Sequence, residues 1–156
     1  MSTDIVDAAT RSRMMAGIRG SNTKPELIIR RGLHALGFRY RLHDRRLAGR
    51  PDMVLPRYRA VIFIHGCFWH GHDCPLFRWP KTREAFWHEK IGRNRERDVE
   101  TEAKLDHAGW RILKIWECSI RGTDRIGVDA VLPRAAEWLG SAAGAGEIRG
   151  AVRASG

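Results

Sequence analysis

Short apolar runs separated by polar and glycine-rich connections set the pattern of the chain. Residues 53–55 (MVL) and 58–65 (YRAVIFIH) are apolar and partly β-branched, which is typical of buried strands. Residues 110–116 (WRILKIW) predict a third central strand, and residues 38–42 predict an edge or antiparallel strand. The pattern therefore indicates a sheet with at least one strand contributed from each half of the chain.

Three helices are predicted before, between and after these strands. Thr23 and Glu26 form a capping box with a proline in the first turn, and the helix that follows ends at Gly37. Thr82 is expected to cap a long helix that runs to about residue 108, and residues 125–139 predict a terminal amphipathic helix. Helices alternating with strands predict an α/β domain with a mixed central sheet flanked by helices.

The 156 residues are enough for one compact domain, expected at residues 1–140. Residues 9–20 predict a short additional helix, in which Met15 is either a core residue or a contact to a ligand. Residues 141–156 are rich in glycine and alanine without an apolar period, so we expect a mobile tail there.

The charge balance favours a polyanionic partner. There are 28 Lys and Arg against 18 Asp and Glu, which gives a net charge of +10. For a soluble domain this excess most often means nucleic acid, although a generally basic surface is the plain alternative. The sequence holds neither an apolar stretch near 18 residues nor a signal-peptide pattern, so we expect a cytoplasmic protein without a membrane segment.

A cluster of cysteine and histidine follows the second strand. Cys67, His72 and Cys74 lie within eight residues, and Cys118 follows the third strand. Three thiolates and one imidazole are a ligand set for structural Zn²⁺. The alternative is three buried free cysteines beside surface histidines.

An acidic residue stands where the first of the two neighbouring strands begins. Asp52 follows the turn at residues 49–51, and adjacent strands would place it beside the end of the strand that contains Ile64. The Asp52 carboxylate and the main-chain oxygen of Ile64 are ligands that suit catalytic Mg²⁺. The arrangement is typical of a nuclease centre.

Several motifs together resemble one family. GRPD, VIFIHGCFWH, HGCFWHGHDC, FWHEKIGRNRERD and WRILKIWEC, with ATRSRMM upstream, are similar to the very short patch repair (Vsr) DNA mismatch endonucleases over residues 9–120. The resemblance implies a restriction-endonuclease-like fold and a monomeric bacterial enzyme of the nucleoid that nicks one strand of double-stranded DNA. It implies cleavage 5′ to the thymine of a T:G mismatch left by deamination of 5-methylcytosine, and mismatch-repair proteins as candidate partners.

The resemblance also suggests roles for individual residues. His70 is expected to be the general base and His65 to assist it, since the second acidic residue and the lysine of many nucleases are absent beside Asp52. Glu26 would also face the active site instead of only capping a helix. Asp98 would orient a histidine, unless it pairs with arginines on a solvated helix.

DNA contacts are expected from Met15 and from three aromatic residues. Phe68, Trp69 and Trp87 flank the predicted chemistry, and the resemblance implies that they intercalate beside the mismatch; packing against the end of the sheet is the alternative. Two other functions are open to this sequence. One is a zinc-stabilised DNA-binding module without catalysis, and the other is a dimeric nuclease that cuts both strands.

Overall fold

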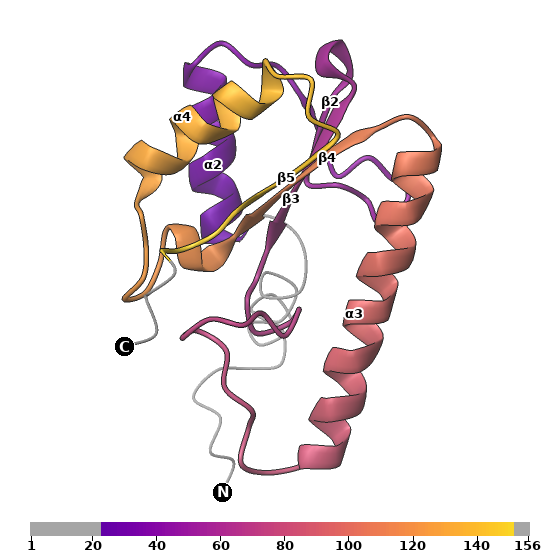
Figure 1. Ribbon diagram of the computed structural model, residues 1–156, viewed down its shortest axis with the longest axis vertical. Coiled ribbons are helices and arrows are strands. Elements are labelled where there is room, and N and C mark those ends of the chain that lie inside the picture. The colour runs from indigo at the N-terminus through magenta and orange to yellow at the C-terminus, as the bar shows by residue number, and fades with distance from the viewer. Residues whose placement is uncertain (1–22, 152–156) are drawn as a thin grey trace, which may run out of the picture.

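The computed structural model describes residues 23–151, which form a five-stranded mixed sheet with helices on both faces (Figure 1). The strands lie in the order β1-β2-β3-β4-β5. β1 is antiparallel to β2 and β2 to β3, whereas β4 and β5 continue the sheet in parallel. Their bounds are β1 Arg41–Leu42, β2 Met53–Leu55, β3 Ala60–His65, β4 Arg111–Trp116 and β5 Ala145–Ile148.

The helices cover the two faces unequally. α2 (Lys24–Ala35) and α4 (Val128–Leu139) pack together on one face, and the long α3 (Glu84–His107) lies on the other side of the sheet (Figure 1). Alternate strand residues enter the two cores, as the period of a strand requires. The α2 and α4 side buries Met53, Leu55, Ile62, Leu113 and Ile115, and the other side buries Val54, Val61, Phe63, Leu105 and Ile112.

The start of α2 confirms the predicted cap. The Thr23 hydroxyl accepts a hydrogen bond from the Glu26 N–H at 3.3 Å, and Pro25 lies in the first turn. Glu26 is only 1% exposed. Its carboxylate is therefore directed into the protein, toward His43, which follows β1.

Two predicted helix starts are wrong. The residue that caps α3 is Arg83 and not Thr82; it has a left-handed backbone (φ 54°) and makes no side-chain capping bond. The last helix begins at Val128, three residues after the predicted start, because Gly127 has φ 92°, which a helix excludes. The predicted strand 38–42 is regular only at Arg41–Leu42.

The predicted mobile tail is wrong for the part of it that the structure describes. β5 pairs with β4 in parallel, and its Ile148 is 5% exposed in the main core. A four-residue strand with one buried side chain has no hydrophobic period to detect. Its structure comes from pairing with β4, a long-range contact.

The expected helix at residues 9–20, with Met15, lies outside the described residues. Among residues 23–151, none of the helices is long and apolar enough to cross a membrane.

Candidate active site and metal centre

The structure brings Asp52 and Ile64 together at the end of β3. The antiparallel register pairs Met53 with Ile62, which sets the residue before β2 beside the last residues of β3. Asp52 is 7% exposed, and its Oδ2 accepts a hydrogen bond from the Ile64 N–H at 2.6 Å. This bond fixes the carboxylate against the strand end, as a metal ligand requires.

A second carboxylate and a histidine complete this corner. The Oε2 of Glu26 accepts hydrogen bonds from Arg30 Nη1 at 2.9 Å and from His43 Nε2 at 2.8 Å. The same His43 nitrogen lies 4.0 Å from Asp52 Oδ1. Ligand atoms of Glu26, His43 and Asp52 all lie within 4.8 Å of one another, a group that could hold a cation.

The environment of Asp52 is unfavourable to its own charge. Burial raises the pKa of this carboxyl well above its usual range, and the neighbouring Glu26 raises it further, while the Ile64 N–H opposes both. Two adjacent carboxylates in a buried corner favour either a shared proton or a cation.

Sequence reasoning missed His43. It lay in a polar connection with no pattern of its own, and its position depends on a left-handed backbone (φ 47°) and on where α2 packs.

On the other side of the same strand end, three side chains form a hydrogen-bonded chain. Asp98 Oδ2 lies 2.5 Å from His70 Nδ1, and His70 Nε2 lies 3.0 Å from His65 Nδ1. The carboxylate fixes the proton of His70 on Nδ1, so Nε2 is the nitrogen that accepts. Burial lowers the pKa of His65 well below its usual range, and the nearby His70 lowers it further, which keeps His65 neutral.

The loop that carries His70 is bound to α3. Asn94 Nδ2 donates to the Trp69 carbonyl at 2.8 Å, and Arg95 donates to the Gly71 carbonyl. Gly71 has φ 60°, and a Cβ there would lie 2.6 Å from the Arg95 guanidinium. The α3 side chains of Asn94 and Asp98 thus hold this loop in place.

A cavity of about 260 Å³ opens beside His70. Its lining adds three residues that the sequence analysis did not assign to the site, and two of them are basic: Lys90, Asn94 and Arg97. With Trp69 and Asp98 they make a polar, charged hollow next to the histidine chain. Lys90, Asn94 and Arg97 lie at i, i+4 and i+7 on α3, a spacing that could have indicated a common helix face.

The three predicted DNA-contacting aromatics are gathered into one group. The ring centroids of Phe68 and Trp87 are 5.3 Å apart, those of Trp69 and Trp87 5.9 Å, and those of Phe68 and Trp69 5.2 Å. All three side chains are half-buried. They pack on one another and on Phe77 and Phe86, at the side of the loop that also carries His70.

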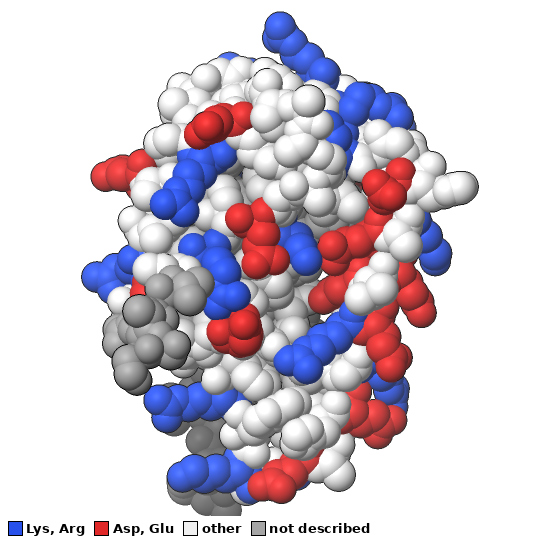
Figure 2. Space-filling view, in the orientation of Figure 1, with Lys and Arg blue, Asp and Glu red and all other residues white. Residues whose placement is uncertain are grey.

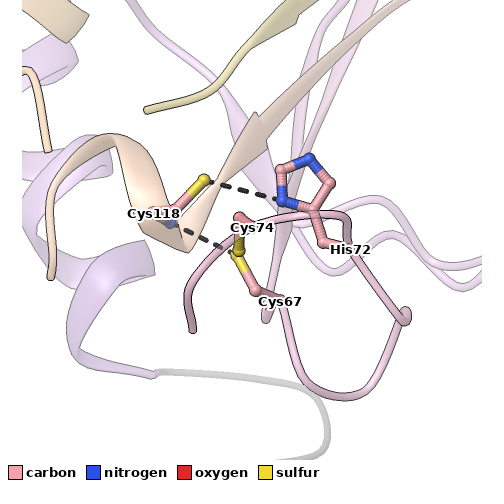
Figure 3. Close-up of side chains that lie close together, drawn as sticks. All are labelled: Cys67, His72, Cys74 and Cys118. Atoms are coloured by element: carbon pink, nitrogen blue, oxygen red, sulfur yellow. Dashed lines mark hydrogen bonds between the residues drawn. The ribbon is translucent and has the colours of Figure 1, made fainter. Parts of the chain in front are cut away.

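The four predicted zinc ligands converge from two parts of the chain (Figure 3). Cys67, His72 and Cys74 come from the loop after β3, and Cys118 comes from the turn after β4. Their ligand atoms lie within 4.8 Å of one another. The Cys118 N–H donates to Cys67 Sγ at 3.3 Å, and Cys118 Sγ lies 3.6 Å from His72 Nδ1.

This donor set fits Zn²⁺. Tetrahedral zinc with Zn–S bonds of about 2.3 Å needs sulfur atoms about 3.8 Å apart, within the observed spread. Burial lowers the pKa of His72, which leaves the ring neutral as a ligand, and Trp116 stacks on it at 3.8 Å. Burial raises the pKa of the Cys67 and Cys118 thiols, so a metal must displace their protons.

Comparisons with known proteins identify the family of the chain. Residues 3–76 match the family model described as DNA mismatch endonuclease Vsr. The chain is 46% identical over 136 residues to DNA mismatch endonuclease Vsr of Escherichia coli (strain K12), which covers 87% of each chain. The chain belongs to the Vsr family of DNA mismatch endonucleases.

Two proteins named as nicking enzymes are also similar over most of the chain. Type II nicking enzyme V.NmeAIP of Neisseria meningitidis is 45% identical over 76% of this chain and 85% of its own. Type II nicking enzyme V.XorIIP of Xanthomonas oryzae pv. oryzae is 45% identical over 76% and 87%. The resemblance seen in the sequence motifs is confirmed, and the protein is a DNA endonuclease of the Vsr type.

The charge of this Vsr-family chain is unevenly spread. Figure 2 shows acidic side chains gathered along α3 on one face, with Lys and Arg among them. The basic cavity residues Lys90 and Arg97 therefore act in a mixed field. Contact with DNA must rely on placed groups as well as on net charge.

Proposed function

We propose that the protein nicks one strand of duplex DNA 5′ to the thymine of a T:G mismatch, the lesion left by deamination of 5-methylcytosine. The single observation that carries the proposal is a buried carboxylate, Asp52, fixed at a strand end beside the His65–His70–Asp98 chain in a member of the Vsr family. The mixed sheet with helices on both faces supports a restriction-endonuclease-like fold.

Asp52 and the main-chain oxygen of Ile64 would hold Mg²⁺, with Glu26 as an outer carboxylate. Bound Mg²⁺ would polarise the scissile phosphate and stabilise the leaving oxygen. His43 and Arg30 hold Glu26 through one oxygen, Oε2. They fix its carboxylate next to Asp52, so both acids face one corner.

His70 would act as the general base through Nε2, with Asp98 orienting the ring. That nitrogen now faces His65 Nδ1 at 3.0 Å. The attacking water must therefore replace His65 as the hydrogen-bond partner of Nε2, which requires the two rings to separate. His65 would then donate to the water or to the phosphate. Because the pKa of His65 is lowered by burial, His65 acts as a neutral hydrogen-bond donor.

Structural Zn²⁺ at Cys67, His72, Cys74 and Cys118 would stiffen the loop that carries both His70 and the aromatic group. Phe68, Trp69 and Trp87 would enter the duplex beside the mismatch. Met15 would add a contact to the bases. The enzyme would act as a monomer on nucleoid DNA in the bacterial cytoplasm, with mismatch-repair proteins as candidate partners.

The test is nicking of duplexes in which each strand is labelled separately. We expect Mg²⁺-dependent cleavage of the thymine strand of a T:G duplex, 5′ to the thymine, and little cleavage of the T:A duplex. Cutting of both strands would favour the dimeric nuclease, and binding without any cleavage would favour a DNA-binding module. The relatives named type II nicking enzymes support a variant of the proposal, nicking in another sequence context, so the flanking bases should be varied.

A further inference from the structure

The strand that replaces the expected tail reaches the metal centre. β5 runs parallel to β4, with Ile148 beside Ile115, one residue before β4 ends. This register carries residues 149–151 along the turn that contains Cys118, and Figure 1 shows β5 following β4 to that end of the sheet.

The backbone of this segment contacts the cluster directly. The Gly150 N–H donates to Cys118 Sγ at 3.3 Å, and the Ala151 N–H donates to the Asp124 carbonyl at 2.7 Å. Gly150 is buried, and a Cβ there would lie 2.6 Å from the Cys118 carbonyl and 2.8 Å from that of Asp124. Only glycine lets the segment approach this closely.

The preceding residue holds the other side of the cluster. Arg149 Nη1 donates to Asp73 Oδ1 at 2.7 Å, and Nη2 donates to the Asp73 carbonyl at 2.9 Å. Asp73 stands between the ligands His72 and Cys74. The planar guanidinium thus fixes both the side chain and the backbone of the residue that joins two ligands.

We infer that Arg149 and Gly150 are positioning residues of the metal centre, so that β5 completes the site by joining the Cys118 turn to the His72–Cys74 loop. Three thiolates and a neutral imidazole leave a zinc complex with one net negative charge. An N–H donor to a sulfur and an adjacent guanidinium stabilise that charge. This inference rests on the proposed zinc, and it gives the last part of the chain a role separate from DNA chemistry.

The experiment measures zinc in the full-length protein. Zinc content of the purified wild type is determined first, and the rate of zinc transfer to the chromogenic chelator 4-(2-pyridylazo)resorcinol is then compared among variants. We expect Arg149→Ala and Gly150→Ala to release zinc roughly tenfold faster, the size usual for groups that orient metal ligands. Arg149→Lys should lie between, because an ammonium keeps the charge but lacks the two nitrogens with which the guanidinium bonds the side chain and the carbonyl of Asp73.

Matched controls separate positioning from general packing. Gly140→Ala introduces a Cβ with only ordinary contacts, 3.7 Å at the nearest, and Arg93→Ala removes a surface ion pair with Glu89 on α3. Both should release zinc at the wild-type rate. Thermal unfolding is measured with and without zinc; a positioning role destabilises the zinc-loaded variants more than the zinc-free ones.

If Arg149→Ala and Gly150→Ala release zinc at the wild-type rate, the inference is overturned. It is also overturned if each variant loses the same stability in its zinc-loaded and zinc-free forms. A wild-type protein without zinc would remove the site and the inference with it. Nicking is not the readout, so none of these outcomes bears on the proposed cleavage of DNA.

Discussion

His70 and Asp98 are 28 residues apart in sequence, and their side chains meet at 2.5 Å between Nδ1 and Oδ2. The contact joins the loop after β3 to α3. It selects the tautomer in which Nε2 of His70 is the accepting nitrogen, the state that a general base needs.

Asp98→Asn should therefore slow nicking at least about tenfold with little change in DNA affinity, since an amide can also donate to Nδ1 and favour the wrong tautomer. Single-turnover cleavage with saturating T:G duplex measures the effect. Glu100→Gln, an exposed acid on the same helix, is the control and should keep the wild-type rate. If Asp98→Asn nicks DNA at the wild-type rate, the function of His70 does not depend on orientation of its ring by Asp98.

Asp52→Asn should abolish nicking and raise stability in the absence of divalent cations. The folded pKa of Asp52 lies above its unfolded value, so ionising it costs folding free energy as pH rises through the folded pKa. The amide keeps an acceptor for the Ile64 N–H without the charge. We expect a gain of about 1 kcal/mol near pH 7.5 that shrinks toward pH 4, measured by thermal unfolding in a chelator.

Added Mg²⁺ should stabilise the wild type and not Asp52→Asn. If Asp52→Asn is less stable than the wild type at neutral pH without metal, the charge of the Asp52 carboxylate does not destabilise the fold. If Asp52→Asn still cleaves DNA, Asp52 is not a ligand of the catalytic metal.

Much of this site was predictable because its signals are local or follow from strand register. The Cys67–Cys74 cluster lies within one loop, and Asp52 sits beside Ile64 because two short neighbouring strands leave few registers. His43 was not predictable, since a left-handed turn and the packing of α2 decide its position. β5 was missed because its order comes from β4 and from contacts at Gly150, not from its own composition.

His43→Leu should weaken the use of Mg²⁺, because it removes the hydrogen bond from His43 Nε2 that holds Glu26 Oε2. We expect the Mg²⁺ concentration for half-maximal nicking to rise roughly tenfold while DNA affinity is unchanged. His43→Gln, whose amide can still donate to Glu26, should restore most of the wild-type response.

His107→Leu, at the exposed end of α3, controls for loss of a histidine. Equal Mg²⁺ dependence in His43→Leu and wild type would show that His43 is not needed to position Glu26, and would remove His43 from the site.

Trp69→Ala should lose preference for T:G over T:A duplexes while zinc content stays the same, with smaller losses in Phe68→Ala and Trp87→Ala. The three rings are half-buried and pack on one another within 6 Å, on a loop that Asn94 and Arg95 bind to α3. A group held this way keeps its shape when pushed between base pairs. Unstacking costs a few kcal/mol, and it costs least where pairing is already distorted, as at a T:G wobble.

The aromatic group would thus convert weak pairing into a difference in cleavage rate, which competition between labelled T:G and T:A duplexes measures. Mismatched DNA should also quench tryptophan fluorescence more than matched DNA. Trp110→Phe provides the control, because Trp110 precedes β4 at the end of the sheet away from His70 and packs under Arg59. If all three variants keep the full mismatch preference and quenching is equal for both duplexes, the aromatic group does not enter the DNA, and mismatch recognition must lie with the polar residues of the cavity, Lys90, Asn94 and Arg97.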